Sequence, residues 1–260
     1  RLAVPRLRRF LPVRKIHVCA PRREFARFHA ALGSDVVLLD EDEVVPGLRL
    51  AELRKLKLPG FPRGAGWYFQ QLLKCGFAFL GAPEDSYLIW DADTVPLRKI
   101  ELFDESGRTY FTRADEHHAP YFENYERLLG RAAAPPCSFI AQHIVVQKTH
   151  MRAMLSEIEG RISGAENWAW KIMRTLSGPH SNLFSEYEFY GNYVYSAHPE
   201  EVVLRDLSWT RDGVQLASFH PTDADLDRLA KRFDFVSFES GRVPWRKAVR
   251  WIKARLACNG

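Results

Sequence analysis

The chain has 260 residues, of which 46% are apolar and 27% charged, with a formal net charge of +5. This composition is that of a globular protein with a sizeable core, which excludes a disordered or fibrous chain. No apolar run approaches the roughly 18–20 residues that a membrane-spanning helix needs. The N-terminal stretch is interrupted by prolines and arginines and lacks a signal-peptide pattern.

The cysteines and the basic residues narrow the class further. Four widely spaced cysteines form no CxxC pair, so reduced thiols are expected instead of a disulfide or zinc framework. Lysines and arginines gather at the two ends of the chain, whereas the middle is close to neutral or acidic. This distribution argues against a nucleic-acid groove across the domain.

Strand and helix patterns alternate in the first half. Apolar runs predict strands over residues 15–20, 35–39 and 87–90, and helical patterns cover 21–32 and 67–80. An acidic loop is expected at 40–43, and a loop rich in proline and glycine at 58–66. This order predicts an α/β fold with a mostly parallel central sheet flanked by helices. Ligands of such sheets collect outside the carboxyl ends of the strands.

The second half is more mixed. Strands are expected over residues 108–112, 139–146 and 214–219, and helices over 150–159, 166–176, 185–195 and 244–256. The segment 113–136 is long for a simple connection and is predicted to be a functional loop. No repeat or linker is evident, so we expect one domain over 1–240 and an appended helix within 241–260.

Two carboxylates, Asp91 and Asp93, follow the apolar run 87–90, and Pro96 then prevents the strand from continuing. Two hard oxygen ligands at a strand end suit a divalent cation whose shell phosphate groups complete. The alternative is that both aspartates only shape a turn.

The helix that begins near Gly66 carries an unusual polar face. Trp67, Gln71 and Lys74 recur at helical spacing, and Gln70 neighbours Lys74. Two amides and an ammonium group at a helix start could hold a nucleobase or a diphosphate. Alternatively, the aromatic residues and leucines are core and the amides are merely exposed.

A second helix start combines Ser185 with Glu186 and Glu188. Ser185 and Glu188 fit a capping box, which gives Glu188 a structural explanation. Glu186 lies in the first turn, where a carboxylate can act as a general base on a hydroxyl or simply interact favourably with the helix dipole.

Histidines and the basic C-terminal segment supply the remaining candidates. His220, expected at a strand end, would complete an Asp/Asp/His site for Mn²⁺ or Mg²⁺ with Asp91 and Asp93; a lone histidine can equally be structural. His143 could face either the core or a cleft. Residues 244–256 combine an apolar stripe with lysines and arginines, which suits an anionic membrane surface or a helix docked on its own domain.

Together, the segments 66–74, 90–97 and 185–193 resemble GT-A-type nucleotide-sugar glycosyltransferases. More closely, the chain resembles a bacterial family of uncharacterised glycosyltransferase-like proteins linked to surface polysaccharide synthesis. The resemblance covers roughly residues 15–220. It implies a nucleotide-sugar half over about 15–112 and an acceptor half over about 113–240.

The resemblance also implies roles for single residues. Trp67, Gln70, Gln71 and Lys74 would bind a nucleoside-diphosphate sugar; Asp91, Asp93 and His220 would hold Mn²⁺ or Mg²⁺; and Glu186 and Glu188 would be the catalytic carboxylates. The Glu-Tyr-Glu order of residues 186–188 departs from the acidic Glu-Asp pair common in inverting members. The implied reaction moves a sugar to a hydroxyl of a glycan or lipid-linked acceptor, in a cytoplasmic protein peripheral on the inner face of the plasma membrane.

Two alternatives stay open. Residues 91–95 also fit the DxDxT opening of haloacid-dehalogenase-type phosphatases, in which Asp91 would be the nucleophile and Asp93 a general acid. That motif normally follows the first strand of its domain, whereas two strands precede it here. The other alternative is a non-catalytic membrane-surface binding protein with structural carboxylates.

Overall fold

A computed structural model describes residues 2–34, 36–56, 64–133, 137–164, 166–176 and 182–239. The helix predicted at 244–256 and most of the loop predicted at 58–66 lie outside the described residues. The chain divides into two compact units. The larger unit comprises Arg14–Trp90 and Leu102–Asp206, and the smaller unit comprises Arg1–Val13, Asp91–Glu101 and Leu207–Gly260. Each unit is described by itself.

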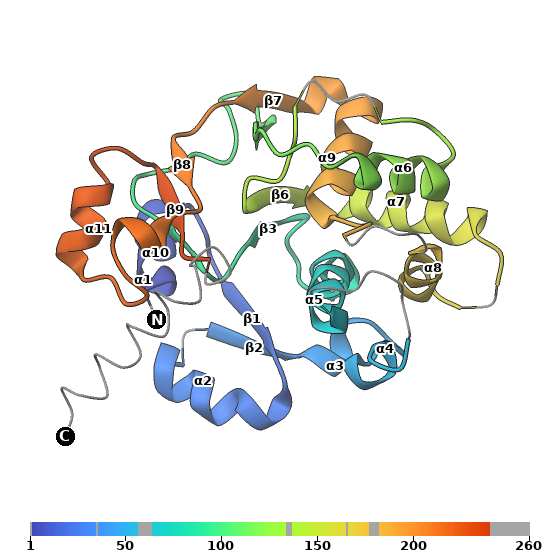
Figure 1. The fold of residues 1–260 in the computed structure, drawn as a ribbon, viewed down its shortest axis with the longest axis horizontal. Coiled ribbons are helices and arrows are strands. Elements are labelled where there is room, and N and C mark those ends of the chain that lie inside the picture. The colour runs from blue at the N-terminus through green and yellow to red at the C-terminus, as the bar shows by residue number, and fades with distance from the viewer. Residues whose placement is uncertain are drawn as a thin grey trace. The chain divides into compact units, whose positions relative to one another are not determined.

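The first half of the larger unit confirms the predicted alternation of strands and helices (Figure 1). Its elements are β1 (Ile16–Ala20), η1 (Arg22–Glu24), α2 (Phe25–Leu32), β2 (Val36–Asp40), α3 (Glu41–Val44), α4 (Leu50–Leu53), α5 (Gly64–Gly76), η2 (Phe77–Phe79) and β3 (Ser86–Trp90). The expected loop at 40–43 is instead the short helix α3. Asp40 caps this helix by accepting a hydrogen bond from the backbone N–H of Asp42 at 3.2 Å.

The second half of the larger unit is richer in helices. It contains β5 (Thr109–Thr112), α6 (Ala119–Leu129), β6 (His143–Gln147), α7 (Lys148–Arg161), α8 (Trp168–Thr175), α9 (Glu186–Ala197), η3 (Pro199–Glu201) and β7 (Val202–Arg205). The segment predicted as a long loop holds α6, which has Pro120 in its first turn and is followed by Gly130 in the left-handed conformation. Of the strand predicted over 139–146, only the part from His143 is extended.

The strand pairings differ from a mostly parallel sheet. β1 pairs with β2 and β5 with β7 in parallel, but β3 pairs antiparallel with β6. Trp90 lies opposite His143, and the two rings stack at 5.1 Å. We predicted that Asp91 follows a strand of a parallel sheet. This prediction is wrong, because β3 pairs antiparallel with β6. The order of elements along the chain does not determine whether two strands pair parallel or antiparallel. Here the pairing depends on contacts between segments over 50 residues apart, such as Trp90 and His143.

Helices α5 to α9 form most of the core of the larger unit, and α9 is buried along nearly its whole length. Gly191 allows the backbone of α9 to lie against Phe139, since an added Cβ would stand 2.4 Å from the ring. Glu186 and Glu188 in the first turn of this helix are both 2% exposed.

The smaller unit is built around a short mixed sheet in the order β4–β9–β8. Its elements are α1 (Ala3–Phe10), β4 (Thr94–Pro96), β8 (Trp209–Thr210), α10 (Gly213–Leu216), α11 (Asp223–Leu229) and β9 (Phe235–Ser237). β4 and β9 pair antiparallel, and Val95, Leu97, Leu226, Leu229 and Val236 make its core.

The strand predicted over 214–219 is wrong, because α10 occupies its first residues. The backbone N–H groups of Gln215 and Leu216 donate to the carbonyl of Asp212, which starts a helical turn. Gly213 permits a close approach to β9, since a Cβ there would lie 2.7 Å from the carbonyl oxygen of Ser237. Apolar and polar residues alternate over 214–219 as they would in a strand, but residues 213–216 form one helical turn.

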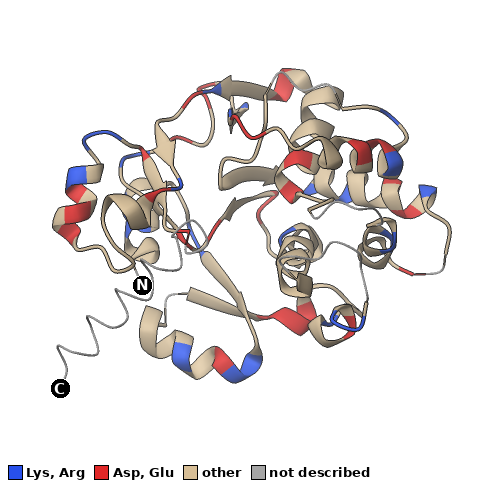
Figure 2. Cartoon of the chain, in the orientation of Figure 1, with Lys and Arg blue, Asp and Glu red and all other residues tan. Residues whose placement is uncertain are grey.

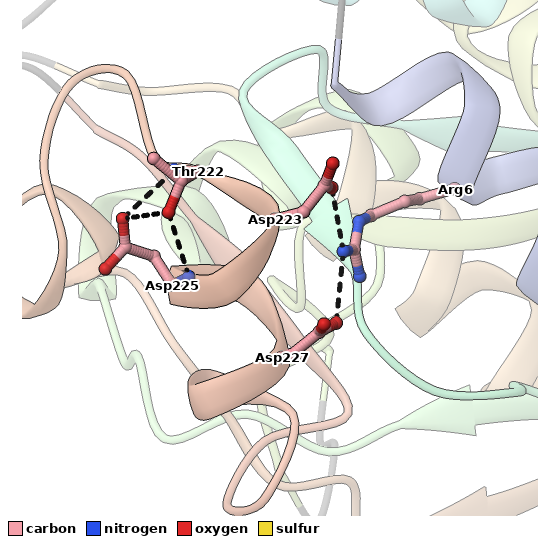
Figure 3. Close-up of polar contacts among 5 residues, drawn as sticks. All are labelled: Arg6, Thr222, Asp223, Asp225 and Asp227. Carbon is pink, nitrogen blue, oxygen red and sulfur yellow. Dashed lines mark hydrogen bonds and ion pairs between the residues drawn. The ribbon is translucent and has the colours of Figure 1, made fainter.

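Arg6 joins α1 to α11 inside the smaller unit (Figure 3). Its guanidinium group is 3.2 Å from Asp223 and 3.4 Å from Asp227, and the residue is only 8% exposed. A capping box between Thr222 and Asp225 starts α11, the helix that carries both aspartates. At least this arginine of the basic N-terminal stretch therefore has a structural role.

Some short helices carry charged residues of mainly one sign (Figure 2). α3 and α11 are predominantly acidic, whereas α1 carries three arginines. No helix within the described ranges is long and apolar enough to span a bilayer.

Candidate functional site

The polar faces of α5 and α9 meet inside the larger unit. Nζ of Lys74 lies 2.6 Å from Oε1 of Glu186, although 112 residues separate the two in the chain. The Glu186 side chain is 3% exposed and that of Lys74 is 19% exposed. The backbone N–H of Glu186 donates to Oε1 of Gln71 at 3.2 Å. Two of the three predicted motifs are thus joined by a nearly buried ion pair and a hydrogen bond.

The remaining predicted residues of α5 lie around this ion pair. Gln71 is buried and donates from Nε2 to the carbonyl of Trp67 at 3.2 Å, so it is not an exposed amide. Trp67 packs against the core and Gln70 is half-buried. The ammonium group of Lys74 also lies 5.0 Å from the ring centre of Tyr187. The structure therefore brings Gln71, Lys74 and Glu186 into one cluster.

Glu188 occupies a separate buried position one residue beyond Tyr187. Its carboxylate accepts hydrogen bonds from the Ser138 hydroxyl and from Nδ2 of Asn192, the latter at 3.1 Å. Burial raises its pKa from 4.5 to about 7, although these hydrogen bonds act in the opposite direction. The Ser185 side chain does accept from the backbone N–H of Glu188, so half of the predicted capping box is present. The Glu188 carboxylate instead accepts from Ser138 and Asn192.

Ser138 also lines an open pocket of about 720 Å³. Its lining includes the carboxylates Asp115, Glu116, Glu123 and Glu126, together with His117, Phe122, Cys137 and Ser138. No lysine or arginine is found among the described residues that line it. The Ser138 hydroxyl also accepts from the backbone N–H of Ile140 at 3.1 Å. Ser138 thus connects this acidic pocket to a buried carboxyl group that titrates near neutral pH.

Asp91 and Asp93 lie in the smaller unit on a tight turn between β3 and β4. The N–H of Thr94 donates to the carbonyl of Asp91 at 2.9 Å, and the N–H of Phe238 donates to the carbonyl of Asp93 at 2.8 Å. Asp93 is exposed and Asp91 is partly buried. Two carboxylates on a turn anchored through its backbone match the oxygen donors that Mg²⁺ and Mn²⁺ prefer.

His220 is exposed on a bend after α10, where its N–H donates to the Ser218 hydroxyl at 3.0 Å. Among the described residues, Asp91, Asp93 and His220 do not form a cluster whose ligand atoms are close enough to hold one ion. His143 is buried, and its ring nitrogens lie 3.2 Å from the Thr112 hydroxyl and 3.0 Å from the Ala141 carbonyl. His143 is therefore a structural residue.

Sequence reasoning missed the partners that define the environment of Glu188. Asn192 stands at the i+4 position of the same helix, a spacing that could have indicated the pair. Ser138 is 50 residues away, and no local pattern indicates that its hydroxyl reaches α9. Most of the pocket lining lies in segment 113–136, which was predicted to be a functional loop, but the helix α6 within it was not predicted.

Comparison with known proteins gives one family and a weak structural likeness. A model described as "Family of unknown function (DUF6492)" matches residues 4–224. No curated protein matches the chain. The crystal structure of mouse xyloside xylosyltransferase 1 in its apo form superposes with a TM-score of 0.49 at 12% identity, covering 94% of this chain and 92% of that one. A likeness at this level does not establish a shared fold.

Proposed function

The chain belongs to the family of unknown function DUF6492, and we propose from its own residues that it is a glycosyltransferase. The proposed reaction moves a sugar from a nucleoside-diphosphate sugar to a hydroxyl of a glycan or lipid-linked acceptor, in cell-surface polysaccharide synthesis. The observation that carries the proposal is the meeting of Lys74 and Glu186 at 2.6 Å. It joins two of the motifs on which the resemblance to GT-A enzymes rests.

We assign donor binding to the polar face of α5, through Trp67, Gln70, Gln71 and Lys74. Glu186 supports this assignment because its carboxylate and backbone hold Lys74 and Gln71 in fixed positions. A preorganised ammonium group stabilises charge that develops on a leaving diphosphate. Glu186 is a candidate base as well, but its ion pair with Lys74 favours the positioning role.

Glu188 is the better candidate for accepting the proton of the acceptor hydroxyl. A base works best when its pKa lies near the working pH, and burial brings the pKa of Glu188 to about 7. An acceptor hydroxyl in the pocket would donate to the oxygen of Ser138, whose own proton passes to Glu188. This relay leaves a nucleophilic oxygen at the sugar, a neutral Glu188 and an unchanged Ser138.

Asp91 and Asp93 are proposed to hold Mn²⁺ or Mg²⁺ through oxygen atoms, without the predicted help of His220, because the ligand atoms of these three described residues do not cluster. When bound, the ion would neutralise charge on the leaving diphosphate, an effect on the order of several kcal/mol. The backbone hydrogen bonds of the turn would fix the spacing of the two carboxylates.

A panel of uridine and guanosine diphosphate sugars, each with Mn²⁺, tests donor binding by thermal shift. We expect one of them to raise the melting temperature of the wild type but not of Asp91→Ala. Asp85→Asn, an exposed carboxylate before β3, is the matched control. If no sugar nucleotide shifts the wild type, donor binding is contradicted. Turnover of a phosphatase substrate abolished by Asp91→Ala would instead favour the phosphatase alternative.

We further propose that residues 244–256 attach the protein to the anionic inner face of the plasma membrane, where a lipid-linked acceptor would be found. The support is the combination of an apolar stripe with basic residues in this segment. Sedimentation with vesicles rich in anionic lipid should pull down the full chain but not a variant that lacks residues 241–260. Equal sedimentation of the two would remove this proposal without affecting the proposed reaction.

A further inference from the structure

Three metal-ligating side chains converge at a place in the larger unit that the proposed reaction does not use. Nε2 of His150 lies 2.8 Å from Oε2 of Glu201, and Nδ1 of His198 lies 3.8 Å from Oε1 of the same carboxylate. All three residues offer ligand atoms within 4.8 Å of one another. The two imidazole rings stack at 4.1 Å with an angle of 25° between their planes.

Hydrogen bonds of the backbone hold these three residues in place. His150 belongs to the first turn of α7, and the preceding Gln147 donates its N–H to the Tyr190 hydroxyl of α9 at 2.7 Å. His198 ends α9, where its N–H donates to the Val194 carbonyl at 2.7 Å. Glu201 follows in η3, and its N–H donates to the His198 carbonyl at 3.1 Å. The donors therefore come from ordered elements that pack against each other.

The donor set selects the class of metal. Imidazole nitrogen suits Zn²⁺ and neighbouring transition metals, whereas Mg²⁺ and Mn²⁺ prefer oxygen ligands. Tetrahedral zinc, with bonds of about 2.0–2.1 Å, places its donor atoms about 3.3 Å apart. Nε2 of His150 stands 2.8 Å from one carboxylate oxygen of Glu201, and Nδ1 of His198 stands 3.8 Å from the other. Binding through one oxygen therefore requires the Glu201 carboxylate to rotate so that this oxygen faces both imidazole nitrogens. Glu201 is about half exposed, which leaves it free to make this adjustment.

We propose that His150, His198 and Glu201 bind one Zn²⁺ ion through two imidazole nitrogens and one carboxylate oxygen, with a fourth position open to water. The carboxylate cancels one of the two charges of the ion, and Glu200, 4.0 Å from Nδ1 of His198, adds a second negative charge nearby. The ion would tie η3 to the start of α7. This site is independent of the proposed glycosyl transfer and of Asp91 and Asp93.

Zinc titration of the full-length, chelator-stripped protein tests the proposal, followed by calorimetry and by the visible spectrum of the Co²⁺ form. We expect one Zn²⁺ per chain and a Co²⁺ spectrum without a thiolate charge-transfer band. His198→Ala and Glu201→Gln each remove a direct ligand and should weaken binding at least tenfold, the lower end of what loss of an outer-shell partner costs. His29→Ala, which removes an exposed histidine of α2, should bind as the wild type does.

Competition with Mg²⁺ distinguishes this zinc site from the site proposed at Asp91 and Asp93. An excess of Mg²⁺ should not displace Zn²⁺, and Asp91→Ala should bind Zn²⁺ like the wild type. If His198→Ala does not fold, Glu201→Gln still tests the zinc site, because this substitution is at an exposed side chain. Absence of Zn²⁺ binding by the wild type would overturn the proposal, as would unchanged affinity in Glu201→Gln and in a folded His198→Ala.

Discussion

Glu188 has the most unusual protonation of the described carboxylates. Burial raises its pKa from 4.5 to about 7, so between these pH values the folded chain holds a proton that the unfolded chain releases. Stability therefore falls as the pH rises through this window and levels off above it. The full cost of ionising the buried group is on the order of 3 kcal/mol.

Glu188→Gln should remove this pH dependence, because an amide does not titrate. We expect the variant to lose less stability than the wild type when the pH rises from 5 to 8, as measured by urea unfolding at several pH values. Glu105→Gln changes an exposed carboxylate and serves as the control. Parallel stability curves for Glu188→Gln and the wild type would contradict the assigned environment.

Asn124 is a second residue whose burial has a measurable consequence. It is 1% exposed on α6, and neither polar atom of its side chain has a hydrogen-bond partner among the described residues. An unsatisfied buried amide costs about 1–3 kcal/mol. Asn124→Leu, which keeps the number and branching of the side-chain heavy atoms, should therefore raise the free energy of unfolding by roughly that amount. A loss of stability in denaturant unfolding would show that the amide has a partner.

At the scale of elements, substitution of two helical glycines by alanine should change the free energy of unfolding in opposite directions. Gly191→Ala in α9 would place a methyl group 2.4 Å from the Phe139 ring and should cost about 1–3 kcal/mol. Gly160→Ala in α7 meets no atom within 4 Å and should stabilise by about 0.5–1 kcal/mol. Thermal unfolding compares the two. Equal effects would mean that the close packing of α9 on Phe139 is wrong.

Elements with strong local patterns were predictable from the sequence, whereas long-range pairings were not. The helix that ends at Gly33 and the helix capped by Ser185 carry their own boundary signals and were placed correctly. The antiparallel partner of β3 and the single turn of α10 depend on contacts with distant segments. For the same reason, Gln71, Lys74 and Glu186 were each predicted as site residues, but the ion pair between Lys74 and Glu186 was not predicted.

At the scale of the whole molecule, we propose different tasks for residues of the two units. The larger unit contains the Lys74–Glu186 ion pair and the acidic pocket with Ser138 and Glu188. The smaller unit carries Asp91 and Asp93 on a turn held by its backbone. A glycosyltransferase needs both a stabilised leaving group and a proton acceptor, so loss of either set should abolish transfer.

Metal-dependent glycosyl transfer can be tested by the release of nucleoside diphosphate, in the presence of Mn²⁺, from the sugar nucleotide that stabilises the protein. We expect turnover by the wild type and by Asp85→Asn. Asp93→Asn should lose at least a hundredfold, on the order expected when several kcal/mol of charge stabilisation disappear. Turnover by Asp93→Asn equal to that of Asp85→Asn, or no Mn²⁺-dependent turnover by the wild type with any sugar nucleotide, would contradict metal-dependent transfer.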